Sequence, residues 1–169
     1  AAEIPNFSLE SPRTYPTASP SGTTGAFIPS FACRGIVDKL YFFAPQFKGF
    51  LGAEMMKTSV YVFDEANEKF CYIDVAVDER FWPMCEPVLM ENGNYIMPGI
   101  YVASDYMAPD NAAAVAISHG SDILHWDMVK IERSEDVRVW GECSIAVDGS
   151  KIKMYCREHS RKLRALYAE

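Results

Sequence analysis

The sequence predicts a mainly β protein, built as an antiparallel sandwich or barrel with one short early helix and a C-terminal helix. Three observations lead to this prediction. About seven short stretches rich in β-branched and aromatic residues follow one another along the chain. Turn-forming residues separate them. A chain of 169 residues has room for a single domain, and many short strands in one domain are typical of a sandwich or barrel.

Residues 1–33 differ in composition from the rest, and we expect them to form an extended N-terminal arm. Prolines punctuate this arm at Pro5, Pro12, Pro16, Pro20 and Pro29. Each proline fixes φ, removes a backbone donor and pushes the preceding residue toward extended geometry. We expect the arm to lie on a neighbouring subunit. Its candidate contact residues are Pro12, Tyr15, Pro16, Pro20 and Phe27.

Residues 34–169 form the single β-rich domain, and we expect it to open with a short helix from Gly35. Ile36, Leu40 and Phe43 fall at a helical spacing, on one face of a 3.6-residue repeat. Pro45 interrupts that pattern, because proline lacks the backbone donor that a helix needs. The helix should therefore end near Phe43 or Ala44.

The next elements are predicted as a β-hairpin and a long loop. Met55 to Phe63 is rich in β-branched and aromatic residues, and residues 69–77 alternate between apolar and polar. Asp64 to Asn67 is predicted to form the turn between them. Residues 78–94 contain several turn-forming residues and predict a loop that carries Trp82.

The second half of the domain is predicted to hold the remaining strands. Tyr95 to Ala103, Ala112 to Ser118 and Asp122 to Glu132 are strand candidates. A further strand runs from Val137 to Val147 and returns after Asp148-Gly149, a pair typical of a type I′ hairpin turn. The last stretch, Glu158 to Ala168, is predicted to be helical.

Charge argues against a nucleic-acid-binding domain, because such domains usually present a basic surface to the phosphates. The formal net charge is −7 and the pI is near 5.0. Residues 151–169 are the exception, with six basic and two acidic residues. We favour a solvated end for this stretch over contact with RNA.

The five cysteines are widely spaced, and no C-x-x-C pair occurs among them. Their odd number and spacing argue against a disulfide framework and a zinc ribbon. We therefore expect an intracellular, reducing environment and no metal or other cofactor. No apolar stretch is long enough to span a bilayer, so we expect no membrane contact.

His119, Asp122, His125 and Asp127 form the most suggestive polar group in the sequence. Histidine and carboxylate at close spacing bind metals or act as acid and base. We favour an ordinary cluster at a loop and strand edge, because no further ligand completes a site. The sequence also lacks the motifs of common enzymes. We predict no catalytic residue, and an enzyme is the less favoured reading.

Aromatic residues are plentiful and support two readings. They are most often core and interface residues, since large rings dominate burial in both places. Trp82 and Trp140 are therefore predicted to lie in interfaces. Alternatively, the rings line the pocket of a small-molecule-binding β-barrel protein or enzyme, with His119, His125, Trp126 and Asp127 near its mouth. A regulatory module that presents an edge strand is a third possibility.

The stretch from Leu40 to Lys57, LYFFAPQFKGFLGAEMMK, resembles a segment of picorna-like virus capsid proteins. In that family a short aromatic helix leads into a basic residue, a glycine and a strand, and Phe47, Lys48, Gly49 and Lys57 stand at the matching positions. The resemblance implies a jelly-roll fold. It also implies a structural subunit of a virion that assembles with copies of itself or with related subunits.

Overall fold

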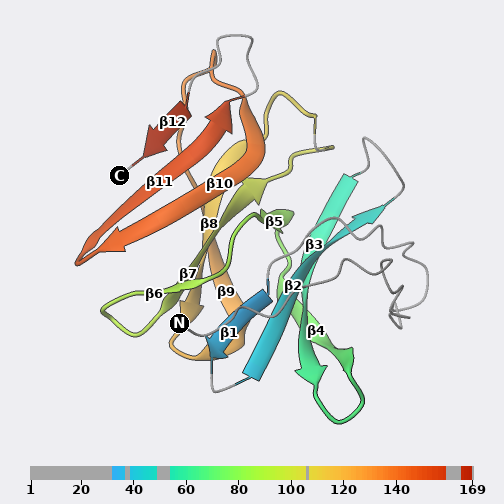
Figure 1. Cartoon of the computed structure of the whole chain (residues 1–169). Helices are drawn as coiled ribbons and strands as arrows, with labels where there is room; N and C mark the ends of the chain where they lie inside the picture. The colour runs from blue at the N-terminus through green and yellow to red at the C-terminus, as the bar shows by residue number, and fades with distance from the viewer. Residues whose placement is uncertain (1–31, 37–38, 49–53, 106, 159–164, 169) are drawn as a thin grey trace, which may run out of the picture.

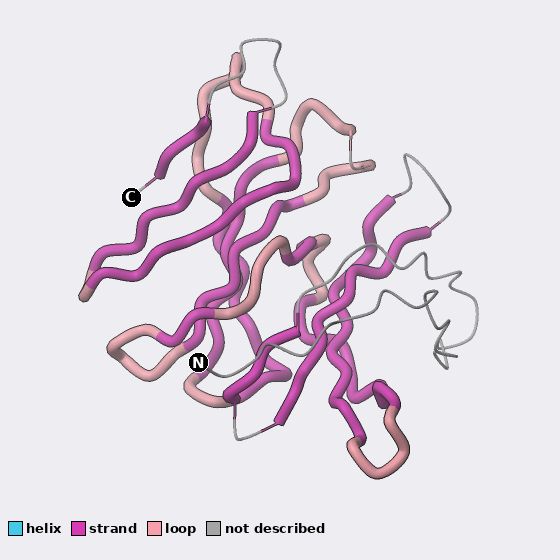
Figure 2. The backbone as a smooth tube through the Cα atoms, viewed as in Figure 1, coloured by secondary structure: helices cyan, strands magenta, loops and turns pink. Residues whose placement is uncertain are grey.

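The computed structural model describes residues 32–36, 39–48, 54–105, 107–158 and 165–168. All regular secondary structure in these residues is β-strand, as Figure 2 shows. The prediction of a mainly β, antiparallel protein is confirmed. No helix capable of crossing a membrane occurs within the described ranges.

The strands form three antiparallel sheets. Sheet A has the order β1-β2-β3-β4. Its strands are β1 (Ala32–Ile36), β2 (Lys39–Lys48), β3 (Glu54–Asp64) and β4 (Lys69–Val77). Sheet B has the order β5-β7-β8-β9, with β6 also paired to β7. Its strands are β5 (Phe81–Pro83), β6 (Val88–Leu89), β7 (Tyr95–Tyr101), β8 (Ala112–His119) and β9 (Asp122–Lys130).

Sheet C has the order β10-β11-β12 and consists of β10 (Val139–Asp148), β11 (Lys151–Glu158) and β12 (Ala165–Ala168). Within each sheet, hydrogen-bonded neighbours are consecutive in sequence, apart from β5 and β7, between which β6 lies. A jelly roll instead pairs strands that are distant in sequence. The described strands form three meanders, and the jelly-roll pairing implied by the resemblance is not seen among them.

Sheet B lies between the other two sheets, as Figure 1 shows. On β7, Met97 packs into the cluster shared with sheet A, whereas Ile96 and Ile100 pack into the cluster shared with sheet C. On β8, Ala114 packs into the cluster shared with sheet A and Val115 into the cluster shared with sheet C. Because both faces of these two strands are buried, their sequences are nearly continuous apolar runs.

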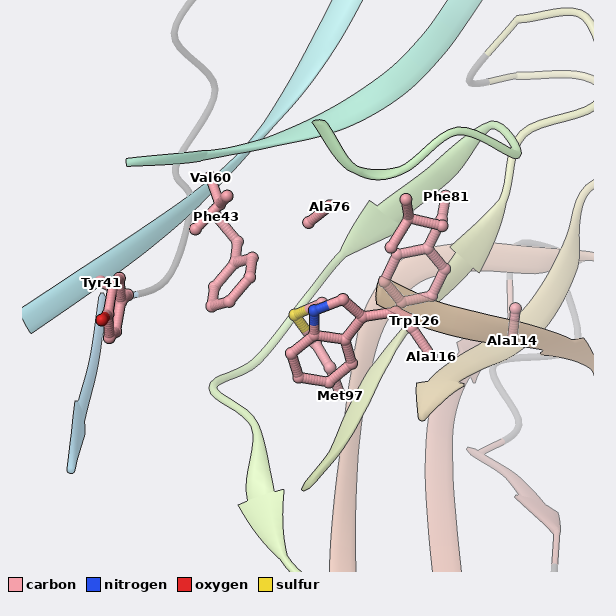
Figure 3. Close-up of a cluster of buried hydrophobic side chains, with 10 residues drawn as sticks. Tyr41, Phe43, Val60, Ala76, Phe81, Met97, Ala114, Ala116 and Trp126 are labelled. Carbon is pink, nitrogen blue, oxygen red and sulfur yellow. The ribbon is translucent and has the colours of Figure 1, made fainter. Parts of the chain in front are cut away.

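The core between sheets A and B is built around large rings, which Figure 3 shows in close-up. Phe43 of β2 meets Trp126 of β9 edge to face, with ring centroids 5.6 Å apart. Phe81 of β5 and Val60 of β3 are fully buried in the same cluster. Ala114 and Ala116 leave room for these rings on the side of sheet B.

Proline and glycine inside β7 each have a local reason. The Pro98 carbonyl accepts a hydrogen bond from the Met84 backbone N–H at 2.9 Å, in the gap between β5 and β6. A residue's N–H and C=O point to the same side of an antiparallel strand, so the missing proline donor faces this gap. A Cβ on Gly99 would run into the Trp82 carbonyl and the Phe81 ring. Only glycine lets β5 approach β7 this closely.

The predicted early helix is wrong, because residues 39–48 form strand β2 and residues 32–36 form β1. The apolar residues of this stretch serve two faces of a sheet: Phe43 points into the core, while Phe42 lies on the other side. Strand pairing to β1 and β3 outweighs the local helical spacing. Pro45 lies beyond Ala32, the first residue of β1, and no described strand pairs with that side of β2 there, so proline is tolerated.

The predicted C-terminal helix is also wrong for the residues that the structure describes. Glu158 ends β11, and Ala165–Ala168 forms β12 antiparallel to it. Pairing along the edge of β11 supplies the hydrogen bonds that the helix would have made. Residues 159–164 lie outside the described ranges.

The remaining strand predictions hold with small changes. The hairpins around residues 64–69 and 148–151 are confirmed. The second has the loop Gly149-Ser150, with Gly149 at φ 60°, and glycine in the first position is the signature of type II′ instead of type I′. The loop expected over residues 78–94 contains β5 and β6, so Trp82 lies in a strand. The predicted arm is outside the described residues up to Phe31, and β1 begins at Ala32.

Candidate functional site

Five aromatic side chains form a continuous group on the outer face of sheet A, the face opposite the core. This outer aromatic face consists of Phe42 on β2, Tyr61 and Phe63 on β3, and Phe70 and Tyr72 on β4. The core clusters contain none of these five residues. The neighbours between them in sequence, Phe43 and Val60 among others, belong to the core between sheets A and B.

Strand register brings the five rings together. Phe42 is the partner of Tyr61 across β2 and β3. Tyr61 is in turn the partner of Tyr72, and Phe63 is the partner of Phe70, across β3 and β4. Successive side chains of a strand point to opposite faces, so residues two apart share a face. Register and alternation therefore determine this cluster without any contribution from the other sheets.

The rings contact one another in tilted and edge-to-face arrangements. Ring centroids are 5.2 Å apart for Phe42 and Phe70, and 5.1 Å apart for Phe63 and Phe70. Tyr61 and Tyr72 meet edge to face at 5.6 Å. Such pairs contribute about 0.5–1.5 kcal/mol each beyond the area that they bury. The outer aromatic face is therefore a preformed surface of several contacting rings.

Solvent reaches part of this surface. Tyr72 is 36% exposed, whereas Tyr61 is buried among its neighbours. Burial, and then the nearby Tyr72, raises the pKa of Tyr61 above its usual value. Burial and then Asp74 raise the pKa of Tyr72. Both tyrosines therefore keep their protons to a higher pH than a free tyrosine does.

A polar pair continues the same face along β2. Gln46 lies four residues from Phe42, so its side chain shares the outer side, and its Nε2 donates to the Ser59 hydroxyl. Gln46 is 7% exposed and Ser59 is fully buried. The other amide atom, Gln46 Oε1, is buried and accepts no hydrogen bond. Leaving a buried acceptor without a donor costs free energy.

The histidines and aspartates singled out in the sequence form two separate pairs at the β8–β9 hairpin. His119 Nε2 lies 2.9 Å from Asp127 Oδ2, and His125 Nδ1 lies 2.7 Å from Asp122 Oδ2. The backbone N–H of Leu124, and then His125, hold the pKa of Asp122 below its usual value. All four side chains are largely exposed, from 41% to 76%.

These pairs do not form a pocket with Trp126. The Trp126 ring is buried in the core against Phe43, and its Nε1 donates to the Ile123 carbonyl at 2.8 Å. His125 and Asp127 lie on the opposite, exposed side of β9. Among the described side chains, no group of three or more His, Cys, Asp or Glu is placed to hold a metal ion.

A cavity of about 200 Å³ lies elsewhere, between the start of β8, the 131–139 segment and the edge of sheet C. Its lining includes Ala113, Arg133, Val139, Cys156 and Leu166. The Arg133 guanidinium is occupied by the loops, because it donates to the carbonyls of Val137 and Pro109. Its position is explained by loop anchoring alone.

Two cysteines face each other where sheet C meets sheet B. Cys143 and Cys156 are direct partners across β10 and β11, and both are buried. The Cys156 sulfur, followed by burial, raises the pKa of Cys143. The Cys143 thiol is therefore expected to be unreactive, as a core cysteine usually is.

Among the side chains predicted to lie in interfaces, the structure describes that of Trp82. Trp82 is half-buried and meets Phe47 edge to face at 5.0 Å, beside the core between sheets B and C. Trp140 lies in β10, and its side chain is outside the described set. The arm residues Pro12, Tyr15, Pro16, Pro20 and Phe27 also lie outside it.

The outer aromatic face was not predicted, although the sequence carries its signal. The rings alternate with Val60, Val62 and Cys71, so both faces of the hairpin are apolar. A hairpin that is apolar on both sides indicates a sheet that contacts something on each face.

Comparison of the chain with protein families, with curated proteins and with solved structures finds no match.

Proposed function

We propose that this protein is a structural subunit that assembles with copies of itself or with related subunits through the outer aromatic face of sheet A. The observation that carries the proposal is the group of five contacting rings on a face to which neither core cluster extends. Aromatic residues are enriched at protein interfaces, and clustered rings are the usual anchors of binding energy. The neutral tyrosine hydroxyls suit the centre of such an interface.

The other candidate sites support this choice. Both His–Asp pairs are exposed and separate, which suits solvated ion pairs better than catalysis. Neither His125 nor Asp127 lines the cavity of about 200 Å³. The alternative of a small-molecule-binding protein or enzyme near these two residues therefore gains no support from this cavity.

A viral capsid subunit is the specific form of this proposal that the sequence resemblance implies. The aromatic part of the resembling stretch lies in strand β2, and Phe42 within it belongs to the proposed interface. The position in a virion, and the intracellular location expected from the cysteines, stay predictions. The self-assembly proposal does not depend on either of them.

Light scattering on the full chain tests the proposal. We expect a mass that is a multiple of 19.0 kDa and that falls toward 19.0 kDa in Tyr72→Lys, because a charge in the outer aromatic face opposes its burial. Tyr155→Lys is the matched control, since Tyr155 is an exposed tyrosine on a strand of sheet C. A wild-type mass of 19.0 kDa at high concentration, or equal dissociation of both variants, would contradict the proposal.

A further inference from the structure

The start of sheet A lies next to the outer aromatic face. Ala32, the first residue of β1, is the register partner of Phe42. Direct partners on antiparallel strands have Cα atoms about 5 Å apart. Residues 1–31 therefore join the sheet beside one of the five rings. A segment of that length is able to reach every ring of the face, since three strand spacings span only about 15 Å.

The composition of residues 1–31 matches an aromatic surface. The segment contains five prolines, at Pro5, Pro12, Pro16, Pro20 and Pro29. Proline-rich chains favour the polyproline II conformation, which loses little entropy on binding. Aromatic-lined grooves recognise this conformation by packing rings against the proline side chains. The segment has two acidic residues and one arginine, so it brings a formal net charge of only −1 to this surface.

We propose that the outer aromatic face is the docking site for the proline-rich segment 1–31 of this sequence. The inference rests on the proposed function in one respect: in the assembly, the segment comes from a neighbouring copy. Exchange of an identical element between copies is a low-cost route to an oligomer. The rings then provide the apolar contact.

Photo-crosslinking in the full chain tests this assignment. Tyr72 is replaced by the photoreactive amino acid benzoylphenylalanine, and the crosslinked peptides are identified by mass spectrometry. The matched control carries the same replacement at Tyr155, an exposed tyrosine of sheet C. We expect position 72 to crosslink to residues 1–31 and position 155 not to do so. Crosslinks from position 72 only to other parts of the chain, or none at all, overturn the docking site.

Mixing normal and nitrogen-15-labelled copies before irradiation identifies the donor of the segment. Crosslinks between differently labelled chains support both the docking site and the proposed function. Crosslinks only within a chain support the docking site and overturn assembly through this face. An oligomer without any crosslink to residues 1–31 supports assembly and overturns the docking site.

A second set of variants tests the chemistry of the segment. Pro12, Pro16 and Pro20 lie outside every described strand, and the first variant replaces all three by serine. We expect the crosslink yield from position 72 to fall at least fivefold, because the preference for polyproline II is lost. Replacing Ser11, Ser19 and Ser21 by alanine is the control and should preserve the yield. Equal yields in the two triple variants would show that proline recognition does not hold this segment.

Discussion

The two faces of sheet A are similar in composition and different in environment. On the inner face, Phe43 has no solvent exposure and packs edge to face against Trp126 of sheet B. On the outer face, Phe42 and Phe70 contact each other and the neighbouring rings of the same sheet. The inner rings join two sheets, whereas the outer rings join strands of one sheet. The comparison shows that an aromatic residue on these strands packs either between two sheets or against rings of its own sheet, depending on which face it occupies.

The difference has an energetic consequence. Burying a large apolar side chain fully contributes about 1.5–3 kcal/mol, and removing it from a core adds the cost of a cavity. Rings on a partly exposed face contribute less to folding, and their remaining apolar surface is available to a partner. Stability and association should therefore respond to different sets of aromatic substitutions.

The largest effect is expected from removing an inner ring. Phe43→Ala should lower the free energy of unfolding by about 3–5 kcal/mol, because Phe43 is fully buried against Trp126. Urea unfolding monitored by tryptophan fluorescence measures this loss. Phe70→Ala on the outer face is the paired comparison and should cost under about 1.5 kcal/mol. Equal losses in the two variants would remove the distinction between the faces.

A smaller effect is expected where the inner core is already tightly packed. Gly99→Ala should destabilise the protein by about 1–3 kcal/mol, because the added methyl meets the Trp82 carbonyl and the Phe81 ring. Thermal unfolding of the variant and the wild type measures this loss. A Gly99→Ala protein as stable as the wild type would show that β5 is not held against β7.

The coupling between outer rings should be smaller again. A double-mutant cycle on Phe63 and Phe70, whose centroids are 5.1 Å apart, should give an interaction energy of about 0.5–1.5 kcal/mol. Urea unfolding of the two single variants and the double variant supplies the cycle. Fully additive losses would mean that the rings do not support one another in solution.

The smallest expected effect concerns pH. Burial raises the pKa of Tyr61 above its ordinary value of 10.0, so the unfolded chain loses this proton first as pH increases. The resulting stabilisation is complete below pH 10 and is lost as pH rises through the higher folded-state pKa. Tyr61→Phe should therefore show a shallower alkaline decline in unfolding free energy than the wild type. Parallel declines would exclude Tyr61 as the cause.

Local sequence patterns predicted the hairpins well. Asp64 accepts hydrogen bonds from the backbone N–H groups of Ala66 and Asn67, which closes the β3–β4 turn from within the turn itself. The glycines of the β8–β9 and β10–β11 turns adopt positive φ for the same local reason. Information of this kind lies within a few residues, so no distant contact is needed to use it.

The same reasoning failed where distant strands decide the outcome. The spacing of Ile36, Leu40 and Phe43 suits a helix, but Phe43 is held in a strand by its partner Val60 and by packing against Trp126. The group of His119, Asp122, His125 and Asp127 lies in the β8–β9 hairpin. Their division into two exposed pairs, with Trp126 turned into the core, depends on the register of β8 and β9.

By itself the sequence determined that this protein is built from antiparallel strands, and where most of its hairpins turn, because alternation and turn chemistry are local properties. Only the tertiary structure decided that β7 and β8 are covered on both faces, since this requires sheets A and C to pack on them. It also decided that one set of rings in sheet A is core and the other a surface. Because side chains alternate along a strand, Phe42 and Phe43 lie on opposite faces, but only the position of sheet B shows which face is buried.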